Sequence, residues 1–136
     1  MSEAVVQVSN ENQQAVKSTI ERYAALRKSG DIEGLVNLFT AEGSVMPPGA
    51  PTSTGPEALR AAYEPFRTAL GLECTYQFDE ILCSGDLASA RTRSTGTVLN
   101  RDTGEQSPAS WRELFVLRRV AGQWRIAQYM FQGMGS

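Results

Sequence analysis

Apolar residues in the first half of the chain recur every three or four positions, which is the pattern of amphipathic helices. Three stretches show it, at about residues 12–28, 32–39 and 55–70, and we expect a helix in each. Their apolar stripes are Val16, Ile20, Tyr23 and Ala24 in the first, Ile32, Leu35, Val36 and Phe39 in the second, and Leu59, Ala62, Tyr63, Phe66 and Leu70 in the third. The first two helices are joined by so few residues that they must fold back on each other.

Residues that favour helix ends set the boundaries of these helices. Gly30 suits the left-handed position that ends the first helix, and Asp31 can cap the start of the second. Thr54 and Glu57 have the spacing of a capping box at the start of the third helix. Pro65 falls inside the third pattern, so we expect it to kink or shorten that helix.

The second half of the chain contains four long runs with strand-like alternation, separated by short turn signals such as Ser84–Asp86 and Ala121–Gly122. Such short connections predict antiparallel hairpins in sequence order. In the first run the alternation loses phase around Asp79 and Glu80, which indicates a β-bulge there. The four runs are residues 73–83, 87–100, 107–120 and 123–131.

These elements predict a single α+β domain, with three N-terminal helices packed on a strongly curved antiparallel sheet to form a cone-shaped α+β barrel. Long antiparallel strands twist and coil, so one face of the sheet becomes concave. Three helices are enough to cover that face. The length of 136 residues fits one domain and leaves little room for a second. We assign residues 1–136 to this domain and expect residues 1–10 to form a flexible tail.

Charge and composition argue against several kinds of partner. The formal net charge is −2, so no basic field attracts a nucleic-acid backbone. No run approaches the ~20 apolar residues of a membrane-spanning helix, and the N-terminus lacks the pattern of a secretory signal. Cys74 and Cys83 fall on one predicted strand, too far apart for a disulfide, which agrees with a reducing compartment. We expect a cytoplasmic protein without a nucleic-acid or membrane partner.

The chain contains no histidine, and this absence removes whole classes of mechanism. Neither a Ser-His-Asp nor a Cys-His site is possible, and two cysteines alone cannot build a closed zinc site. The acids show no metal-binding spacing, and no glycine-rich phosphate loop is present. We therefore expect no metal and no cofactor, and any acid–base chemistry must use carboxylate, tyrosine, lysine or thiol groups.

Four segments between residues 20 and 131 resemble the nuclear transport factor 2-like superfamily, and in particular its SnoaL-like branch. They are IERYAALRKSGDIEGLVNLFTAEGSVMPPGAP, TGPEALRAAYEPF, SGDLASARTRSTGTV and RELFVLRRVAGQWRIAQYMF. That branch includes ketosteroid isomerases and polyketide cyclases. The resemblance implies a shared fold with an apolar pocket, whereas the chemistry of the pocket differs among its members.

The resemblance to ketosteroid isomerases carries over two of three catalytic positions. Tyr23 matches a tyrosine late in the first helix, and Glu113 falls at or beside a carboxylic acid on a late strand. The position of the proton-abstracting carboxylate falls at Pro47, after Met46, and neither residue accepts a proton. Tyr23 and Glu113 are therefore the catalytic candidates, without the usual base.

The same resemblance implies that Glu113 points into the pocket. Trp111 and Phe115 point the same way, because side chains alternate between the two faces of a strand. We expect the pocket wall, or substrate-binding residues, to comprise Met46, Tyr63, Arg91, Arg93, Trp111, Phe115, Tyr129 and Phe131, with Ala127 on the same face of the last strand. A carboxylate between Trp111 and Phe115 is costly to bury unless it is paired, and Arg91 or Arg93 is the expected partner. The alternative is that these arginines are solvated or lie at an interface, and that the aromatic residues only pack.

Three functions fit this pattern. The first is a cofactor-independent isomerase, cyclase or dehydratase acting on a small apolar, carbonyl-bearing molecule, such as a polyketide-like or steroid-like compound. The second is a non-catalytic protein that binds such a molecule, and the third is an assembly module with a vestigial pocket. Under all three we expect a homodimer through the outer face of the sheet, which carries Leu114 and Val116.

Overall fold

A computed structural model of the protein describes residues 2–67, 70–100 and 102–134. It has an α+β fold in which three α-helices pack on a six-stranded mixed sheet. The helices are α1 (Ser2–Ser29), α2 (Ile32–Leu38) and α3 (Pro56–Tyr63), followed by a 3-10 turn η1 (Glu64–Phe66). The strands are β1 (Phe39–Met46), β2 (Ser53–Thr54), β3 (Leu70–Ser84), β4 (Leu87–Asn100), β5 (Gln106–Val120) and β6 (Gln123–Gly133).

The sheet has the strand order β2-β1-β6-β5-β4-β3. The predicted antiparallel meander of four long strands, β3 to β6, is confirmed. The expectation of a purely antiparallel sheet is wrong, because β1 runs parallel to β6. A parallel neighbour requires a long crossover connection, and here the two strands come from opposite halves of the chain. The sheet is open in the described residues, since β2 and β3 stand at the two ends of the order.

The helix boundaries follow the sequence signals in part. Gly30 has a φ of 73° and ends α1, and Asp31 accepts a hydrogen bond from the backbone N–H of Gly34 at 2.9 Å, as predicted. The capping box at Thr54 is wrong: Gly55 is the N-cap of α3, without a side-chain hydrogen bond. Thr54 instead pairs with β1, where its hydroxyl lies 2.7 Å from that of Ser44.

Two further boundaries differ from the predicted ones. The helix α1 begins at Ser2 and so includes the segment expected as a tail. Residues 2–29 contain no glycine or proline. This range therefore has no strong helix breaker that would delay the start of α1. At its far end α3 gives way to the 3-10 turn at Glu64–Phe66, which contains Pro65. The expected shortening at this proline is confirmed.

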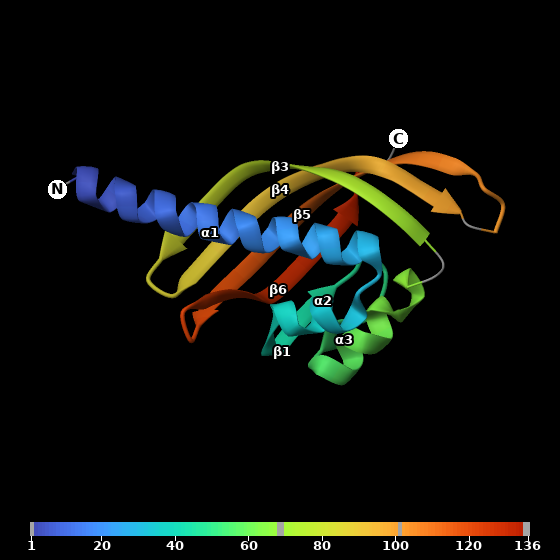
Figure 1. Cartoon of the computed structure of the whole chain (residues 1–136), viewed down its shortest axis with the longest axis horizontal. Coiled ribbons are helices and arrows are strands. Elements are labelled where there is room, and N and C mark those ends of the chain that lie inside the picture. The colour runs from blue at the N-terminus through green and yellow to red at the C-terminus, as the bar shows by residue number, and fades with distance from the viewer. Residues whose placement is uncertain (1, 68–69, 101, 135–136) are drawn as a thin grey trace.

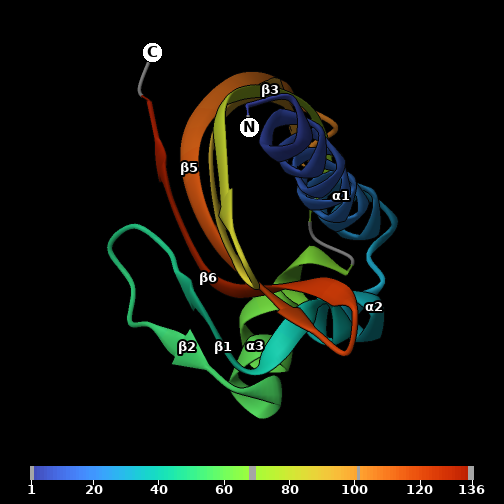
Figure 2. The same cartoon turned by 90° about the vertical axis from the view of Figure 1, so that its left-hand side faces the viewer.

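The long strands bend around α1. Figure 1 shows α1 crossing β3 to β6 at an angle, with α2, α3 and β1 grouped below its C-terminal end. The view along the molecule in Figure 2 shows the strongly curved sheet, with α1 on its concave side. Long strands coil in this way because each strand twists. No helix in the described part of the chain has the length and apolar character needed to span a membrane.

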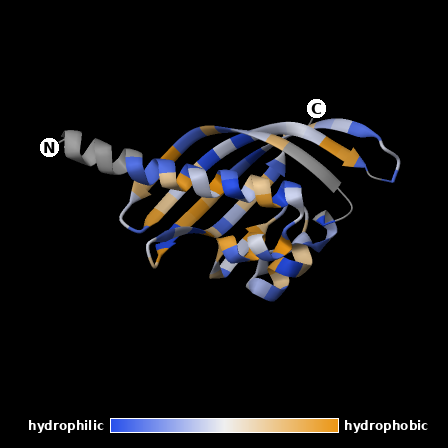
Figure 3. Ribbon diagram, viewed as in Figure 1, coloured by the Kyte–Doolittle hydropathy of each residue, from blue (hydrophilic) through white to orange (hydrophobic). Residues whose placement is uncertain are grey.

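The core residues lie between α1, α2 and the concave face of the sheet. Apolar and polar segments alternate along the strands in Figure 3, as expected for a sheet with one buried face. The largest fully buried side chains include Tyr23, Ile20, Phe115, Leu117 and Tyr129. Cys74 and Cys83 are free thiols, as predicted.

Two irregularities change which residues face inward. The predicted bulge on β3 is confirmed, because the register with β4 shifts between Phe78 and Glu80. A second shift, between Val116 and Leu117, breaks the register of β5 with β6. On β6 it brings Ile126 to the buried face along with Tyr129. Ala127, expected on that face, instead lines an outer surface depression beside Gln128.

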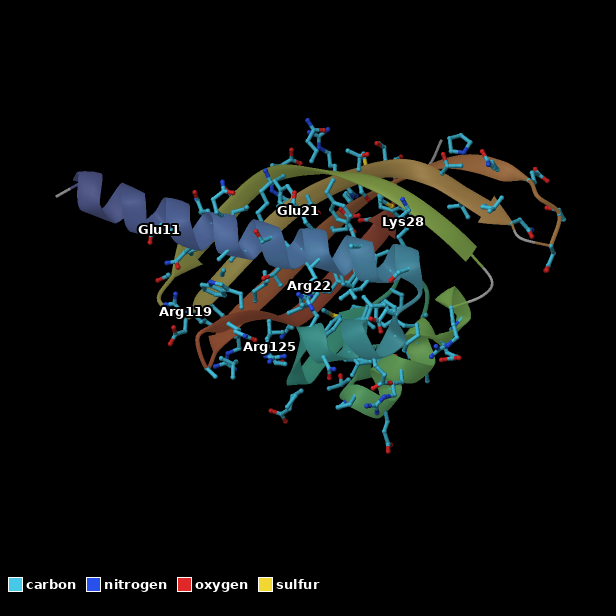
Figure 4. The ribbon with its side chains drawn as sticks, in the orientation of Figure 1. Glu11, Glu21, Arg22, Lys28, Arg119 and Arg125 are labelled. Atoms are coloured by element: carbon cyan, nitrogen blue, oxygen red, sulfur yellow. The ribbon has the colours of Figure 1, made fainter. Side chains whose placement is uncertain are left out.

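Side-chain hydrogen bonds join α1 to the strands of the sheet. Gln13 donates to the carbonyl of Ile81 at 2.8 Å. Arg119 donates to Asn12 at 3.1 Å and to Asp86 at 2.9 Å, and Figure 4 labels it beside the N-terminal half of α1. The bonds of Asn12 and Gln13 therefore join the N-terminal half of α1 to the sheet.

Candidate functional site

The centre of the candidate site is Glu113, a buried carboxylate on the concave face of β5. Only 5% of its surface is exposed. Thr92 donates its hydroxyl to Oε1 at 2.6 Å, and Ser94 donates its hydroxyl to Oε2. Both donors come from β4, which lies beside β5 with Thr92 directly opposite Glu113. The inward orientation implied by the resemblance is therefore present.

The two hydroxyls orient the side chain of Glu113. A carboxylate only accepts hydrogen bonds, whereas a carboxylic acid must also donate one. Here each oxygen of Glu113 receives a donated hydrogen bond. Each carboxylate oxygen has two lone-pair directions, so it can still accept a proton from a further group. The arrangement suits a proton acceptor.

The expected partners of Glu113, Arg91 and Arg93, lie on the other face of the sheet. The prediction that they share its face is wrong, because Arg91 lies opposite Leu114 and Arg93 opposite Arg112. A shift of one residue in strand register moves every side chain to the opposite face. Both arginines are exposed and pair with Asp79 instead.

The contacts of Asp79 define this outer cluster. Arg93 makes a two-pronged salt bridge to it, with distances of 2.8 and 2.9 Å. Arg91 lies 3.8 Å from the same carboxylate. The hydrogen bonds from Arg93 hold the pKa of Asp79 below its ordinary value, against the opposing effect of desolvation. This acid is a paired surface residue and carries no role at the inner site.

A second group of polar atoms in the interior is a pair of tyrosine hydroxyls. Tyr23 on α1 and Tyr63 on α3 are both buried, and their hydroxyl oxygens lie 2.7 Å apart. Burial raises the pKa of Tyr23, although the Arg27 charge and hydrogen bonds from Tyr63, Tyr129 and Arg27 oppose the rise. Burial also raises the pKa of Tyr63 well above its ordinary value. Both are neutral hydroxyls at physiological pH, able to donate hydrogen bonds.

Aromatic rings connect the tyrosine pair with Glu113. Phe115 stacks on Tyr129 with ring centres 4.3 Å apart, and Tyr129 stacks on Phe131 at 5.3 Å. Tyr23 meets the edges of both Phe115 and Tyr129. Phe131 lies directly opposite Glu113 on the neighbouring strand. Glu113 and Phe115 are alternate residues on one face, about 7 Å apart along the strand, so the acid and the tyrosines belong to one region.

The remaining predicted pocket residues lie at the margins of this region. Trp111 is partly buried and lies opposite Ser94. It precedes Glu113 by two residues on β5. Met46 ends β1 and pairs with Met130 of β6, and Pro47 follows it. No carboxylate occupies that position, as the sequence indicates.

Sequence reasoning missed four residues of the site: Thr92, Ser94, Arg27 and Tyr76. The first two alternate with Arg91 and Arg93, so the correct strand register would have found them. Arg27 stands four residues after Tyr23, on the same helical face. Burial lowers the pKa of Arg27, but the neighbouring tyrosines outweigh this and keep it above its ordinary value. Burial raises the pKa of Tyr76, which lies opposite Ser94.

The described residues offer no set of metal ligands. No group of three or more Cys, Asp or Glu side chains in residues 2–67, 70–100 and 102–134 is placed to hold a metal ion.

Comparison with known proteins agrees with this architecture. A model of the SnoaL-like domain family matches residues 20–127. The structure is similar to that of a ketosteroid isomerase-like protein from Erwinia carotovora atroseptica, with a TM-score of 0.85, 29% sequence identity, and coverage of 93% of this chain and 99% of that chain. No curated protein sequence matches the chain.

Two more distant structures, both from Novosphingobium aromaticivorans, share the fold. One is provisionally described as a scytalone dehydratase, with a TM-score of 0.84, 16% identity, and coverage of 91% of this chain and 85% of that chain. The other is a nuclear transport factor 2-like protein with a cystatin-like fold, with a TM-score of 0.78, 22% identity, and coverage of 98% and 88%. Identities this low support the fold alone.

Proposed function

The chain belongs to the SnoaL-like domain family, and from that premise we propose that it is a small-molecule pocket protein that catalyses proton transfer without a cofactor. Its substrate is a largely apolar, carbonyl-bearing molecule, such as a polyketide-like or steroid-like compound. The observation that carries the proposal is the buried Glu113 carboxylate, which receives hydrogen bonds from Thr92 and Ser94. In this proposal the curved sheet and the helices enclose a cone whose interior receives the ligand.

The proposed step is removal of a proton from the carbon next to the carbonyl group. The Glu113 carboxylate takes the proton, the C–H bonding electrons form a carbon–carbon double bond, and the carbonyl π electrons move to oxygen. The resulting enolate oxygen receives a hydrogen bond from the Tyr23–Tyr63 pair, whose hydroxyls lie 2.7 Å apart. Donors already aligned in a dry site stabilise such charge effectively. Glu113 then returns the proton to another carbon in an isomerisation, or to a leaving hydroxyl in a dehydration.

Glu113 takes the role of base because the usual position does not supply one. That position falls at Pro47, which has no ionisable side chain. A carboxylate that accepts two hydroxyl donors keeps its acceptor character, whereas one paired with an arginine would lose much of it. Among the similar structures, one is named for an isomerase and one for a dehydratase, two of the reaction classes in this proposal.

The first test is an isomerisation assay with β,γ-unsaturated cyclic ketones of increasing size. Their conversion to conjugated ketones raises ultraviolet absorbance, and exchange of the proton next to the carbonyl in D₂O reports proton removal directly by NMR. We expect the wild-type protein to accelerate both, and Glu113→Gln to reduce the rates by at least about 100-fold, the lower range for a general base. The variant keeps the shape and polarity of the side chain, so its melting temperature serves as the control for folding.

The outcome separates this function from the alternative of a non-catalytic binding protein. Ketones that raise the melting temperature but undergo no exchange would make the chain a ligand carrier. Equal exchange by the wild-type protein and Glu113→Gln would remove Glu113 from the mechanism.

The outer face of the sheet is the surface through which we propose that two copies pair. Leu114 is 46% exposed and Met130 is 50% exposed, side by side on neighbouring strands. They line a surface depression of about 380 Å³ together with Arg91 and Arg93. We expect Leu114→Lys to convert the dimer into a monomer, measured by sedimentation; a wild-type monomer would contradict the pairing.

A cytoplasmic location also stays a prediction. The two free thiols, Cys74 and Cys83, are compatible with a reducing compartment.

A further inference from the structure

A groove lies between α1, α2 and the turn that joins β5 to β6, and the proposed reaction does not use it. Its volume is about 570 Å³, within the range of about 300–1,000 Å³ that small-molecule sites occupy. The described residues that line it include two arginines and no acid. Its polar side chains are Ser18, Thr19, Arg22, Asn37, Gln123 and Arg125. The groove is therefore large enough for a small molecule and positively charged.

Arg22 supplies one of the two charges from α1. Its side chain is exposed, and Figure 4 shows it on the side of α1 toward Arg125, whereas the adjacent Glu21 lies on the other side. A helical residue pairs with the residues three and four positions away. For Arg22 these are Ser18, Thr19, Ala25 and Leu26. None of them is acidic, so the helix face that carries Arg22 does not neutralise it.

Arg125 supplies the second charge from the start of β6. Its guanidinium donates hydrogen bonds to the backbone carbonyl of Asn37 on α2 and to the side-chain oxygen of Gln123, the latter at 3.4 Å. Both acceptors are neutral, so these bonds orient the guanidinium without cancelling its charge. A guanidinium has five N–H donors, and the two bonds leave others to serve a ligand in the groove.

The two arginines come from distant parts of the sequence and line the same groove. Like charges repel, so their convergence is unfavourable by itself, and an anion between them reverses the sign of the interaction. The hydroxyl of Ser18 and the side-chain amide of Asn37 add neutral donors from α1 and α2. Donors that approach from two helices and a strand match the several oxygens of a tetrahedral phosphate better than the planar pair of a carboxylate.

We propose that this groove binds the phosphate group of a small phosphorylated molecule between Arg22 and Arg125. The rest of the groove accommodates the organic part of that molecule. The inference goes beyond the proposed function and does not depend on it, because Glu113, its two hydroxyl donors and the tyrosine pair lie outside the described lining of the groove. Failure of the reaction at Glu113 would leave this site untouched.

The first test is an NMR titration of the isotope-labelled protein with inorganic phosphate and with malonate, at constant ionic strength. At about pH 8 both probes are close to dianions, so they differ in shape more than in charge. We expect phosphate to shift the amide resonances of Arg22, Gln123 and Arg125 in a saturable way. It should bind roughly tenfold more tightly than malonate, the effect of one additional charge-assisted hydrogen bond.

Substitution of each arginine tests the assignment of the site. Arg22→Gln and Arg125→Gln should each weaken the binding of phosphate at least about tenfold, because each removes a charge-assisted hydrogen bond. Arg112→Gln is the matched control: Arg112 is also exposed and donates to a neutral glutamine, Gln132, at 3.0 Å, but it lies outside the lining of the groove. It should change the affinity by no more than about twofold.

Arg22→Gln decides the outcome if Arg125→Gln fails to fold, because an exposed side chain on a helix surface is replaced with little effect on stability. Phosphate that binds Arg22→Gln as tightly as the wild-type protein would overturn the site. An equal loss of affinity in Arg112→Gln would also overturn it, since the attraction would then belong to the overall charge. Malonate that binds as tightly as phosphate would overturn the phosphate class.

Discussion

Four consecutive residues of β4 contact two carboxylates, one on each face of the sheet. Arg91 and Arg93 point outward to Asp79, while Thr92 and Ser94 point inward to Glu113. The outer acid lies near two cations in a solvated position. The inner acid is 5% exposed, and within the described residues its side-chain hydrogen bonds come from neutral hydroxyls.

The difference teaches what makes a carboxylate available for chemistry. An ion pair with arginine stabilises the charge of Asp79 and lowers its affinity for a proton. Neutral hydroxyl donors orient Glu113 without placing an opposite charge beside it. A buried charge is costly to maintain unless it is well hydrogen-bonded, so the arrangement points to a use for Glu113 that Asp79 does not share.

Among the variants that compare the two faces of β4, the largest expected effect comes from moving the inner carboxylate while keeping its charge. Glu113→Asp shortens the side chain by one carbon–carbon bond, roughly 1.5 Å. A misplacement of about 1 Å can cost about 100-fold in rate, so we expect a loss between about tenfold and 100-fold in proton exchange of a bound ketone. Asp79→Asn, on the outer face, should leave the exchange rate unchanged. Equal losses in the two variants would contradict the assignment of roles.

The hydroxyl donors should contribute to stability on the inner face alone. Thr92→Val and Ser94→Ala each leave an oxygen of buried Glu113 without its donor, and we expect each to lower the free energy of unfolding by about 1–3 kcal/mol. Thr95→Val is the matched control on the exposed side of β4, with an expected change within about 0.5 kcal/mol. Urea unfolding measures all three. A small effect at Thr92 and Ser94 would mean that water replaces their hydroxyls.

Sequence reasoning reached the strands but not the correct faces of β4. Alternation on β5 and β6 placed Glu113, Phe115, Tyr129 and Phe131 correctly inward, with the family resemblance choosing between the two faces. The loop between β4 and β5 does not fix a register by its length alone, and a slip of one residue exchanges Arg91 and Arg93 for Thr92 and Ser94. The inward position of the Glu113 carboxylate could therefore be predicted. Its hydrogen-bond donors, Thr92 and Ser94, could be identified only from the observed pairing of β4 with β5.

The helix side of the site was predictable to a similar degree. Tyr23 and Tyr63 stand on apolar stripes, so their burial follows from periodicity. Their contact does not, because it depends on how α3 packs against α1 after a connection through β1 and β2.

The ultraviolet absorbance of the interior tyrosines reports on the inner face of the sheet. The chain has four tyrosines, and burial is the main cause that raises the pKa of each. A free tyrosine is mostly ionised at about pH 11, so we expect no tyrosinate absorbance there until the protein unfolds. Because the folded values are raised, this contribution to stability is complete below about pH 10 and declines above it. Tyrosinate absorbance near pH 10 with an intact circular dichroism spectrum would contradict a buried cluster.

The smallest expected effect belongs to the outer acid. The pKa of Asp79 is lowered by its hydrogen bonds to Arg93, so its contribution to stability is present above the unfolded value of about 3.9 and is lost as the pH falls through the folded value. We expect the stability of Asp79→Asn to fall less steeply than that of the wild-type protein below about pH 4. Urea unfolding across this range checks the slope. Parallel slopes would show that the ion pair contributes nothing in solution.

The most direct test of the account is a crystal structure with a bound phenol, the aromatic mimic of an enol. The account predicts that the phenol lies on the concave side of the sheet, with its oxygen within hydrogen-bond distance of the Tyr23–Tyr63 pair and its ring edge facing Glu113. A phenol bound beside Arg91 and Arg93 on the outer face, or an interior closed around Glu113 by packed side chains, would contradict it.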